Sequence, residues 1–262
     1  MLFPIDVHRL ARELSTSHEW ADPVHLDVTG STNVEAIERA RPWSPVLAEL
    51  QTAGRGRLGR AWQEVPRAGL AMSVLVPVID RAGWLPLAAG LAVRGALEQH
   101  GVRAGLKWPN DVLLPDDEDR KVCGILCQLL PGGGGIVVGI GINVHHDRDQ
   151  LPVATASSLR LVGADVDRTA LAADVLCRLR ALHEDLDAGE ERAKGVRRAY
   201  HDACVTIGRE VDVHRPDGSV DRVTATGVDD EGRLVVTGEG GSDTVAAGDV
   251  QHIRPAGTSP RP

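Results

Sequence analysis

The chain has 262 residues, 42% of them hydrophobic and 25% charged, which is typical of a soluble globular protein with one large domain or with a medium and a small one. Its 29 Lys and Arg against 37 Asp and Glu give a formal net charge of -8, which argues against a nucleic-acid coat or an anionic membrane surface as the partner. No apolar run approaches about 18 residues, and the N-terminus lacks a basic region followed by an apolar run, so neither a transmembrane helix nor a signal peptide is expected.

The first two hundred residues contain helices and strands in no regular alternation. In chain order, the pattern predicts a helix at 6–14, a strand at 24–29, a helix at 30–40 capped by Ser31 or Thr32, a strand at 45–51, a glycine–arginine loop at 52–61, a strand at 69–76 and an apolar helix at 84–100. It continues with strands at 104–114 and 121–130 around a solvated acidic tip at 116–120, a buried strand at 135–144, and helices at 169–187 and 190–203. This order indicates a mixed or antiparallel sheet with helices, in the α+β class.

The pattern changes near residue 205. Five short alternating segments follow within about fifty residues and are separated by glycine-containing turns, which is typical of a small β-barrel. We therefore expect a larger domain at 1–204, a small domain at 205–255, and a disordered tail at 256–262.

Aromatic residues make up only 3% of the chain, and five of them are tryptophan. Such a core must consist mainly of Leu, Val, Ile and Ala, so each tryptophan needs its own explanation. Trp62 and Trp108 lie inside the motifs described below, whereas Trp20, Trp43 and Trp84 are expected to serve in packing.

The four cysteines, at 123, 127, 177 and 204, form no CxxC pair, and no His/Cys cluster has zinc-binding spacing. Cys123 and Cys127 lie in one predicted strand, too far apart for a disulfide. Reduced thiols in a cytoplasmic protein, with no protein-bound metal site, are therefore expected.

The sharpest local signal is GRGRLGR at 54–60, which places three arginines among three glycines in an acidic chain. Glycine lets the backbone approach a ligand closely and present its N–H groups to an anion. Arginine adds bidentate contacts to carboxylate or phosphate. A solvated basic turn is the simpler alternative, but it would not need glycines at these positions.

Gly54, Gly56 and Gly59 also satisfy the GxGxxG pattern of a dinucleotide site, and Asp80 follows at a suitable distance. The segment after the loop contains Pro66 and then a strand pattern, however, and not the helix whose N-terminus would hold a diphosphate. A Rossmann site is therefore disfavoured.

Two further motifs bring polar groups together at strand ends. KWPNDV at 107–112 contains Lys107, Asn110 and Asp111, and GIGINV at 139–144 places Asn143 in an apolar strand. Lys121 begins the apolar run KVCGILCQLL, where it could extend its stem along the surface or direct its ammonium group into a pocket. A buried Asn or a turn Asp is more often structural, so no single motif decides the function.

Together these segments resemble the biotin protein ligase family. The matching elements are GSTN at 30–33, ELQTAGRGRLGRAW at 49–62, KWPNDV at 107–112, RKVCGIL at 120–126 and GIGINV at 139–144, in the family's order and across about 25–255. The resemblance implies a mixed-sheet catalytic domain like that of class II synthetases and of biotin/lipoate ligases, followed by a small SH3-like β-barrel. It also implies ATP-dependent activation of biotin to biotinyl-5′-AMP and transfer of biotin to one lysine of a biotin carboxyl carrier domain.

The resemblance carries roles to individual positions. Ser31, Thr32, Asn33 and Gln51 resemble the biotin-facing residues, and Gly54, Arg55, Gly56, Arg57 and Arg60 resemble a loop that folds over biotin and the adenylate. Trp62, Lys107, Asn110, Asp111, Gly124 and Asn143 resemble residues on the ATP side. Lys121 resembles the catalytic lysine, with Arg57 and Asp111 as further catalytic candidates and Asp111 as a possible proton acceptor. Mg²⁺ is expected to bind mainly through the phosphates.

Two other functions stay open. A lipoate-type acyl ligase would use related chemistry, although GRGRLGR with KWPND favours biotin. A biotin-responsive repressor would carry a winged helix before the catalytic domain, but the GSTN element begins at residue 30, and neither a nucleic-acid nor a membrane partner is expected.

Overall fold

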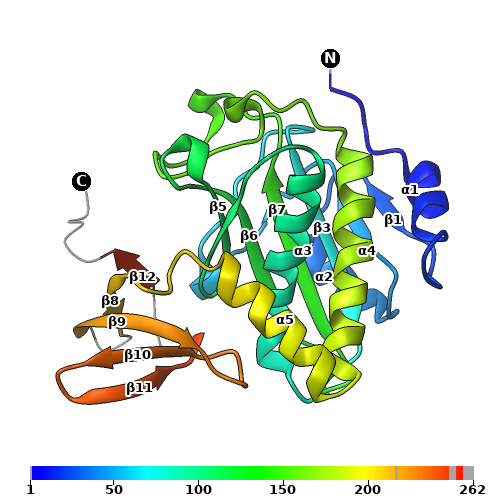
Figure 1. The fold of residues 1–262 in the computed structure, drawn as a ribbon. Helices are drawn as coiled ribbons and strands as arrows, with labels where there is room; N and C mark the ends of the chain where they lie inside the picture. Colours follow the sequence, from blue (N-terminus) through cyan, green and yellow to red (C-terminus); the bar gives the residue numbers. More distant parts are fainter. Residues whose placement is uncertain (1, 216–217, 248–251, 256–262) are drawn as a thin grey trace.

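A mixed seven-stranded sheet forms the centre of the larger part of the molecule (Figure 1). The structure is a computed structural model that describes residues 2–215, 218–247 and 252–255. Across the sheet the strands follow the order β1 (Val24–Leu26), β2 (Val46–Ala48), β3 (Gly69–Val76), β7 (Ile136–Asn143), β6 (Arg120–Leu129), β5 (Asp111–Leu114) and β4 (Gly105–Lys107). β1 and β2 pair in parallel and the other neighbours pair antiparallel, which confirms the mixed sheet expected from the sequence.

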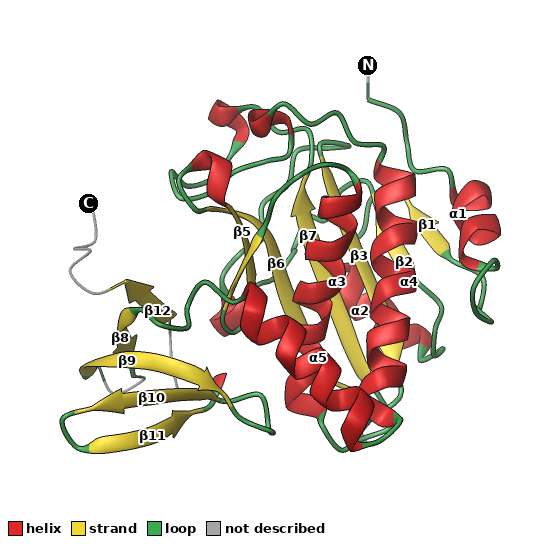
Figure 2. Ribbon diagram, viewed as in Figure 1, coloured by secondary structure: helices red, strands yellow, loops and turns green. Residues whose placement is uncertain are grey.

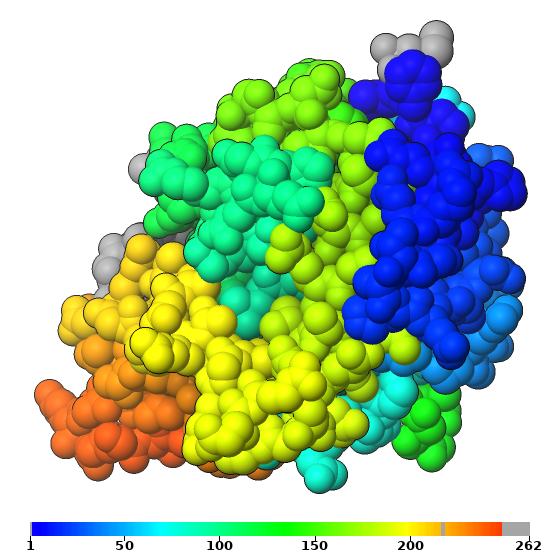
Figure 3. All heavy atoms as spheres, turned by 45° about the vertical axis from the view of Figure 1, so that its right-hand side comes forward, coloured from blue at the N-terminus to red at the C-terminus, as the bar shows by residue number. Residues whose placement is uncertain are grey.

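The helices lie where the periodicity predicts them (Figure 2). They are α1 (Val7–Leu14), α2 (Thr32–Arg39), α3 (Leu85–Gln99), α4 (Arg168–Asp187) and α5 (Glu190–Ala203). α3, α4 and α5 lie together on one face of the sheet (Figure 1). The N-terminal residues pack along the side of the molecule next to α4, as Figure 3 shows, and the C-terminal strands lie next to α5.

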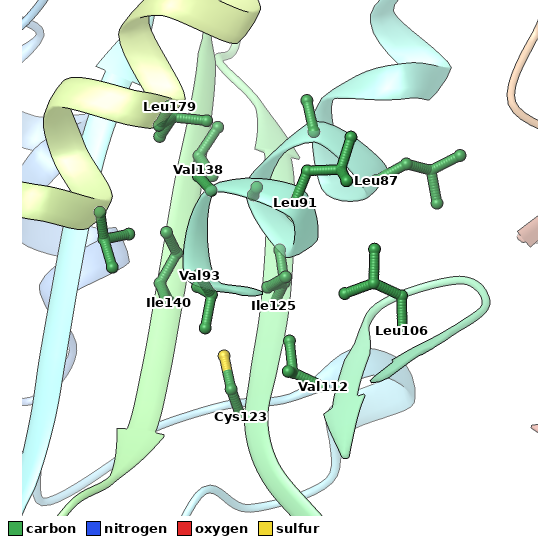
Figure 4. Close-up of a cluster of buried hydrophobic side chains, with 14 of the residues drawn as sticks. Leu87, Leu91, Val93, Leu106, Val112, Cys123, Ile125, Val138, Ile140 and Leu179 are labelled. Carbon is green, nitrogen blue, oxygen red and sulfur yellow. The ribbon is translucent and has the colours of Figure 1, made fainter. Parts of the chain in front are cut away.

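The main core lies between α3, α4 and the sheet. Figure 4 shows Leu91 of α3 near Ile125 of β6, with Leu87 of α3 and with Val138 and Ile140 of β7 in the same cluster. Strand alternation sends the other side chains to the opposite face. There α2 covers only a small second cluster, formed by Ala36, Val46, Leu75 and Val137. The rest of that face is available for a site.

Two local predictions need correction. Ser31 is the N-cap residue of α2, but its side chain makes no capping hydrogen bond. The segment 104–114 is not one strand but two, β4 and β5, separated at the cis peptide bond between Trp108 and Pro109.

The acidic tip is mostly exposed, as expected, but Asp117 within it is not. Asp117 accepts hydrogen bonds from Ser157, Arg148 and Arg120, and its carboxylate is only 13% exposed. Burial raises the pKa of Asp117, but these donors outweigh it and hold the pKa below its usual value. The tip therefore anchors the 148–157 loop beside β6.

The C-terminal strands form a separate five-stranded antiparallel sheet in the order β11 (Gly241–Val245), β10 (Leu234–Gly238), β9 (Val220–Val228), β8 (Glu210–His214) and β12 (His252–Pro255). Its 229–232 turn docks onto the larger part. The Trp84 indole donates to the Asp229 and Asp230 carbonyls at 3.1 and 3.0 Å, and the Trp108 indole donates to the Gly232 carbonyl at 3.1 Å. The predicted tail at 256–262 lies outside the described residues.

The other expected packing tryptophans form one cluster. Trp20 and Trp43 meet edge to face with ring centroids 5.5 Å apart, and the Arg180 guanidinium lies 4.6 Å from the Trp43 ring. Within the described ranges, no helix is both long and apolar enough to cross a membrane.

Candidate active site

A row of small residues crosses the open face of the sheet. The register aligns Ala71 on β3 with Gly141 on β7, Gly124 on β6, Asp111 on β5 and Lys107 on β4. Residues directly opposite each other on neighbouring strands point to the same face. The sheet therefore offers a flat floor of glycine and alanine that ends in a carboxylate and an ammonium group.

The Trp62 indole lies flat on this floor. A Cβ at Gly141 would lie 2.6 Å from Trp62 Cε2, and one at Gly124 would lie 3.1 Å from Trp62 Cζ3. Gly141 therefore accepts no side chain while Trp62 lies there, and a side chain at Gly124 would press on both Trp62 and Lys121. Trp62 also lies 5.8 Å from the Lys121 ammonium group, measured to the ring centroid.

The charged groups meet at Asp111. Its carboxylate pairs with Lys121 Nζ at 2.6 Å, and both side chains are partly exposed. Arg57 reaches the same region from the glycine–arginine loop and donates to Asn110 Oδ1 at 3.4 Å. Burial lowers the pKa of the Arg57 guanidinium while Asp111 raises it. Lys121 and Arg57 thus bring two cationic groups into the region of the Asp111 carboxylate.

A buried polar cluster lies at the N-terminus of α2. The Ser73 hydroxyl is 2.7 Å from Thr32 Oγ1 and 2.6 Å from Asn33 Oδ1. Because a hydroxyl has a single proton, Ser73 donates to one of these two oxygens at a time. The Asn33 amide group donates to Gln128 Oε1 at 2.6 Å. A Cβ at Gly139 would lie 2.0 Å from Asn33 Oδ1, so this glycine admits Asn33 to the sheet face.

Gln51 links this cluster to the loop. Its Oε1 accepts from the Thr32 backbone N–H at 2.8 Å and from the Thr32 hydroxyl at 3.0 Å. It thereby satisfies the free N–H of the first residue of α2. The side chain of the N-cap residue Ser31 would instead accept from the N–H of the second or third residue of the helix. Its amide nitrogen donates to Glu64 at 3.0 Å.

The glycine–arginine loop folds back on itself. Gly56 N–H donates to the Arg60 carbonyl at 2.7 Å, and Trp62 N–H donates to the Gly54 carbonyl at 2.8 Å. Arg55 forms an isolated bridge with Ala61, and the side chains of Arg55 and Arg60 are exposed. Arg57 is half-buried, and its contact with Asn110 reaches the floor.

The two predicted asparagines hold backbone segments. Asn110 donates to the Ile125 carbonyl at 2.9 Å, which fixes the turn after Pro109 against β6. Asn143 is buried and donates to the Ser157 carbonyl at 2.9 Å. Ser157 N–H in turn donates to the Lys121 carbonyl at 2.7 Å, so Asn143 supports the backbone of Lys121.

Several site residues were not recognised from the sequence. Ser73, Glu64 and the glycines at 139 and 141 had no predicted role, and none was assigned to Gln128. Ser73 gave a readable signal, a single hydroxyl in an apolar strand. Glu64 gave none, because its partners come from elsewhere in the fold.

The cysteines serve in packing. All four are free, and burial raises the pKa of the Cys127 thiol to about 12. A thiol protonated at neutral pH is a poor nucleophile and a poor metal ligand. In the part of the chain that the structure describes, no group of three or more His, Cys, Asp or Glu side chains could hold a metal ion.

Comparison with known proteins gives consistent matches over most of the chain. Residues 27–147 match the model of the biotin/lipoate A/B protein ligase family, and residues 206–253 match the biotin protein ligase C-terminal domain. The chain is 35% identical to the biotin–[acetyl-CoA-carboxylase] ligase of Mycobacterium tuberculosis over 96% of this chain and 97% of that protein. It is 29% identical to the bifunctional ligase/repressor BirA of Bacillus subtilis over 87% of this chain and 73% of that protein.

The structure is also similar to the biotin protein ligase from Aquifex aeolicus in complex with biotin and ATP. The TM-score is 0.78, with 28% sequence identity, and the match covers 89% of this chain and 99% of that one. The similarity therefore extends over both sheets.

Proposed function

Since this chain belongs to the biotin protein ligase family, we propose that it activates biotin with ATP and transfers the biotinyl group to a lysine of a carrier protein. The observation that carries the proposal is the meeting of Lys121, Asp111 and Trp62 on the glycine floor. This floor lies beside the polar cluster around Thr32, Asn33 and Gln51, so one open face offers both an anion site and a site for a polar ring.

The polar cluster suits the ureido ring of biotin. A ureido group has two N–H donors and one carbonyl acceptor, which require partners of both kinds when buried. Thr32, Asn33 and Gln51 supply hydroxyl and amide groups that can both donate and accept. Ser31 stands beside them at the start of α2 with no capping hydrogen bond.

The cationic side suits the reacting groups. Two unit charges of the same sign at about 4 Å repel by about 4 kcal/mol at an effective dielectric constant of about 20, so a carboxylate approaches a triphosphate only if positive charge is supplied. Lys121 and Arg57 supply it at the floor, with Lys107 at the end of the same row and Arg55 and Arg60 on the loop. Trp62 offers its indole to the adenine ring. Asn110 holds the backbone at Ile125, and Asn143 holds the backbone at Ser157.

The reaction then proceeds in two steps. A carboxylate oxygen of biotin attacks the α-phosphorus of ATP, the bond to the β-phosphate breaks, and pyrophosphate leaves. The uncharged amine of the carrier lysine next attacks the acyl carbon, the bond to the AMP oxygen breaks, and AMP leaves. Lys121 stabilises the charge that develops on the α-phosphate oxygens and on the acyl oxygen. Asp111, 2.6 Å from Lys121, is the proposed acceptor of the proton from the carrier lysine.

Mg²⁺ fits this proposal as an ion held mainly by the phosphates, as it is in many nucleotide sites. Asp111 is the carboxylate at the end of the floor row and would be its nearest protein oxygen donor. When bound, the ion would neutralise phosphate charge.

We propose residues 1–204 as the catalytic domain and 205–255 as the SH3-like domain, in line with the separate matches at 27–147 and 206–253. The proposed carrier is the biotin carboxyl carrier domain of a biotin-dependent carboxylase, which the name of the Mycobacterium tuberculosis relative supports. Four free cysteines suit a reducing compartment, and we propose the cytoplasm.

The direct test incubates the protein with ATP, Mg²⁺, biotin and an apo carrier domain, followed by streptavidin blotting. We expect labelling that requires all four components, together with biotin-dependent exchange between ATP and pyrophosphate. Exchange that responds to lipoate but not to biotin would refute the biotin proposal.

We also expect the 54–62 loop to act as a lid over the mixed anhydride, which water would otherwise hydrolyse. The loop carries an apolar tip, Leu58, that is 58% exposed. Hydrogen exchange at 54–62 is therefore expected to slow when biotin binds. Exchange rates at 54–62 that biotin leaves unchanged would contradict the lid.

A further inference from the structure

Glu64 lies between the two proposed subsites and contacts both. Its Oε2 accepts from the Gln51 backbone N–H at 2.8 Å, and its Oε1 accepts from Gln51 Nε2 and from the Trp62 indole N–H, each at 3.0 Å. One carboxylate thus receives three hydrogen bonds from two site residues, all from uncharged N–H groups. Burial raises the pKa of Glu64 despite these donors. A half-buried carboxylate is costly without such partners, so its position is constrained.

The carboxylate determines which way the Gln51 amide group points. An ionised carboxylate only accepts hydrogen bonds, so the Gln51 NH₂ group must face Glu64 and its carbonyl oxygen must face away. That carbonyl oxygen then meets the Thr32 N–H and hydroxyl. The orientation of the cluster at the start of α2 therefore depends on Glu64, through Gln51.

The same carboxylate fixes the indole on the floor. Trp62 has one polar atom, Nε1, and Glu64 accepts its hydrogen. This bond sets the rotation of the ring above Gly124 and Gly141, beside Lys121. Within the described residues, Glu64 makes no hydrogen bond or ion pair with Lys121 or Asp111.

We propose that Glu64 is a positioning residue that joins the biotin subsite to the nucleotide subsite by holding Gln51 and Trp62 on one carboxylate. The inference rests on the proposed function. Loss of this carboxylate should weaken the binding of both biotin and ATP, although Glu64 acts on them only through Gln51 and Trp62.

The test compares Glu64→Ala, Glu64→Gln and the exposed neighbour variant Gln63→Ala in ATP–pyrophosphate exchange, with KM measured separately for biotin and for ATP. Glu64→Ala is expected to raise both KM values about tenfold, the effect of losing a hydrogen bond to a charged group. Glu64→Gln retains a carbonyl oxygen for Gln51 Nε2 and Trp62 Nε1 but turns an NH₂ group toward the Gln51 backbone N–H, so it should recover only part of the loss. Gln63→Ala should match the wild type.

A second measurement separates positioning from general damage to the fold. In a Gln51→Ala background, Glu64→Ala should no longer raise KM for biotin, because the Gln51 side chain that Glu64 orients is already gone. It should still raise KM for ATP, because the Trp62 indole loses its acceptor, while the bond to the backbone N–H of residue 51 holds no ligand-binding side chain. Hydrogen exchange of the Thr32 and Gln51 amides should be faster in Glu64→Ala, and this readout needs no activity.

The outcomes distinguish the two proposals. A wild-type protein without biotin-dependent exchange would refute the proposed function. An active wild type with unchanged KM values and unchanged amide exchange in Glu64→Ala would overturn the role of Glu64. A rise in KM for only one ligand would refute the link between the subsites.

Discussion

Replacement of Lys121 by Met is expected to slow biotin-dependent ATP–pyrophosphate exchange by about 10²- to 10³-fold, the usual cost of losing one group that stabilises transition-state charge. Lys121 Nζ is paired with Asp111, so it acts as a fixed cation and not as a nucleophile. The substitution keeps most of the apolar stem and removes the ammonium group with its charge and its N–H donors. The loss should therefore appear in kcat more than in thermal stability.

The matched control is Lys194→Met. Lys194 is 57% exposed and pairs with Glu191 on the surface of α5, so its loss removes one positive charge from the same protein far from the floor. Exchange by this variant should equal that of the wild type. If Lys121→Met exchanged at the wild-type rate, the electrostatic role of Lys121 would be wrong.

Replacement of Arg168 by Met is expected to cost about 3–5 kcal/mol of unfolding free energy, because it leaves a buried carboxylate without its cation. Arg168 and Glu49 pair at 2.8 Å with side chains 3% and 4% exposed. Arg168 also donates to the Phe3 and Gly69 carbonyls, and Glu49 accepts from the Ile5 N–H. Chemical denaturation of the variant would measure the loss.

The control is Arg39→Met, which breaks the exposed pair with Glu35 on α2 and should cost only about 0.5 kcal/mol. A similar loss in both variants would contradict the role of the buried pair.

Acid should narrow the difference in unfolding free energy between Arg168→Met and the wild type. Burial raises the pKa of Glu49, but the Ile5 N–H and Arg168 outweigh it and hold the pKa below the ordinary value of 4.5. A carboxylate with a lowered pKa stabilises the fold fully above its ordinary pKa and loses that contribution as the pH falls through the folded-state value. Without Arg168 the pKa of Glu49 should rise. Protonation of Glu49 would then remove an unpaired buried charge from the variant, whereas in the wild type it would break the pair with Arg168.

Much of the fold follows from local sequence. The helical spacing of apolar residues over several turns predicts α3 and α4. The strand-like apolar segments predict β3 and β7. The split of the 104–114 segment was harder to predict, because its apolar residues continue on both sides of Pro109. The capping prediction failed at Ser31, whose side chain makes no capping hydrogen bond. The Thr32 N–H is satisfied by Gln51, nineteen positions after Thr32, and no local pattern indicates that contact.

The site divides in the same way. The motifs identify Lys121, Asp111 and Trp62, and the structure brings these three together. Gly139 and Gly141 lie within a recognised motif, but only the register shows that one admits Asn33 and the other Trp62. Glu64 depends on a chain reversal between 51 and 64, which no local pattern encodes.

The contact between the two sheets has a consequence for how the chain can be divided or recombined. A Cβ at Gly83 would lie 2.1 Å from the Glu231 carbonyl oxygen, and one at Gly232 would lie 2.5 Å from the Gly83 carbonyl oxygen. The backbones therefore touch, and the indoles of Trp84 and Trp108 hydrogen-bond to the same turn. A chimera that exchanged the C-terminal sheet for that of a relative would have to retain both glycines and both tryptophans. The two sheets are thus not independently exchangeable at the sequence boundary near residue 205, and they should be kept together from the same protein.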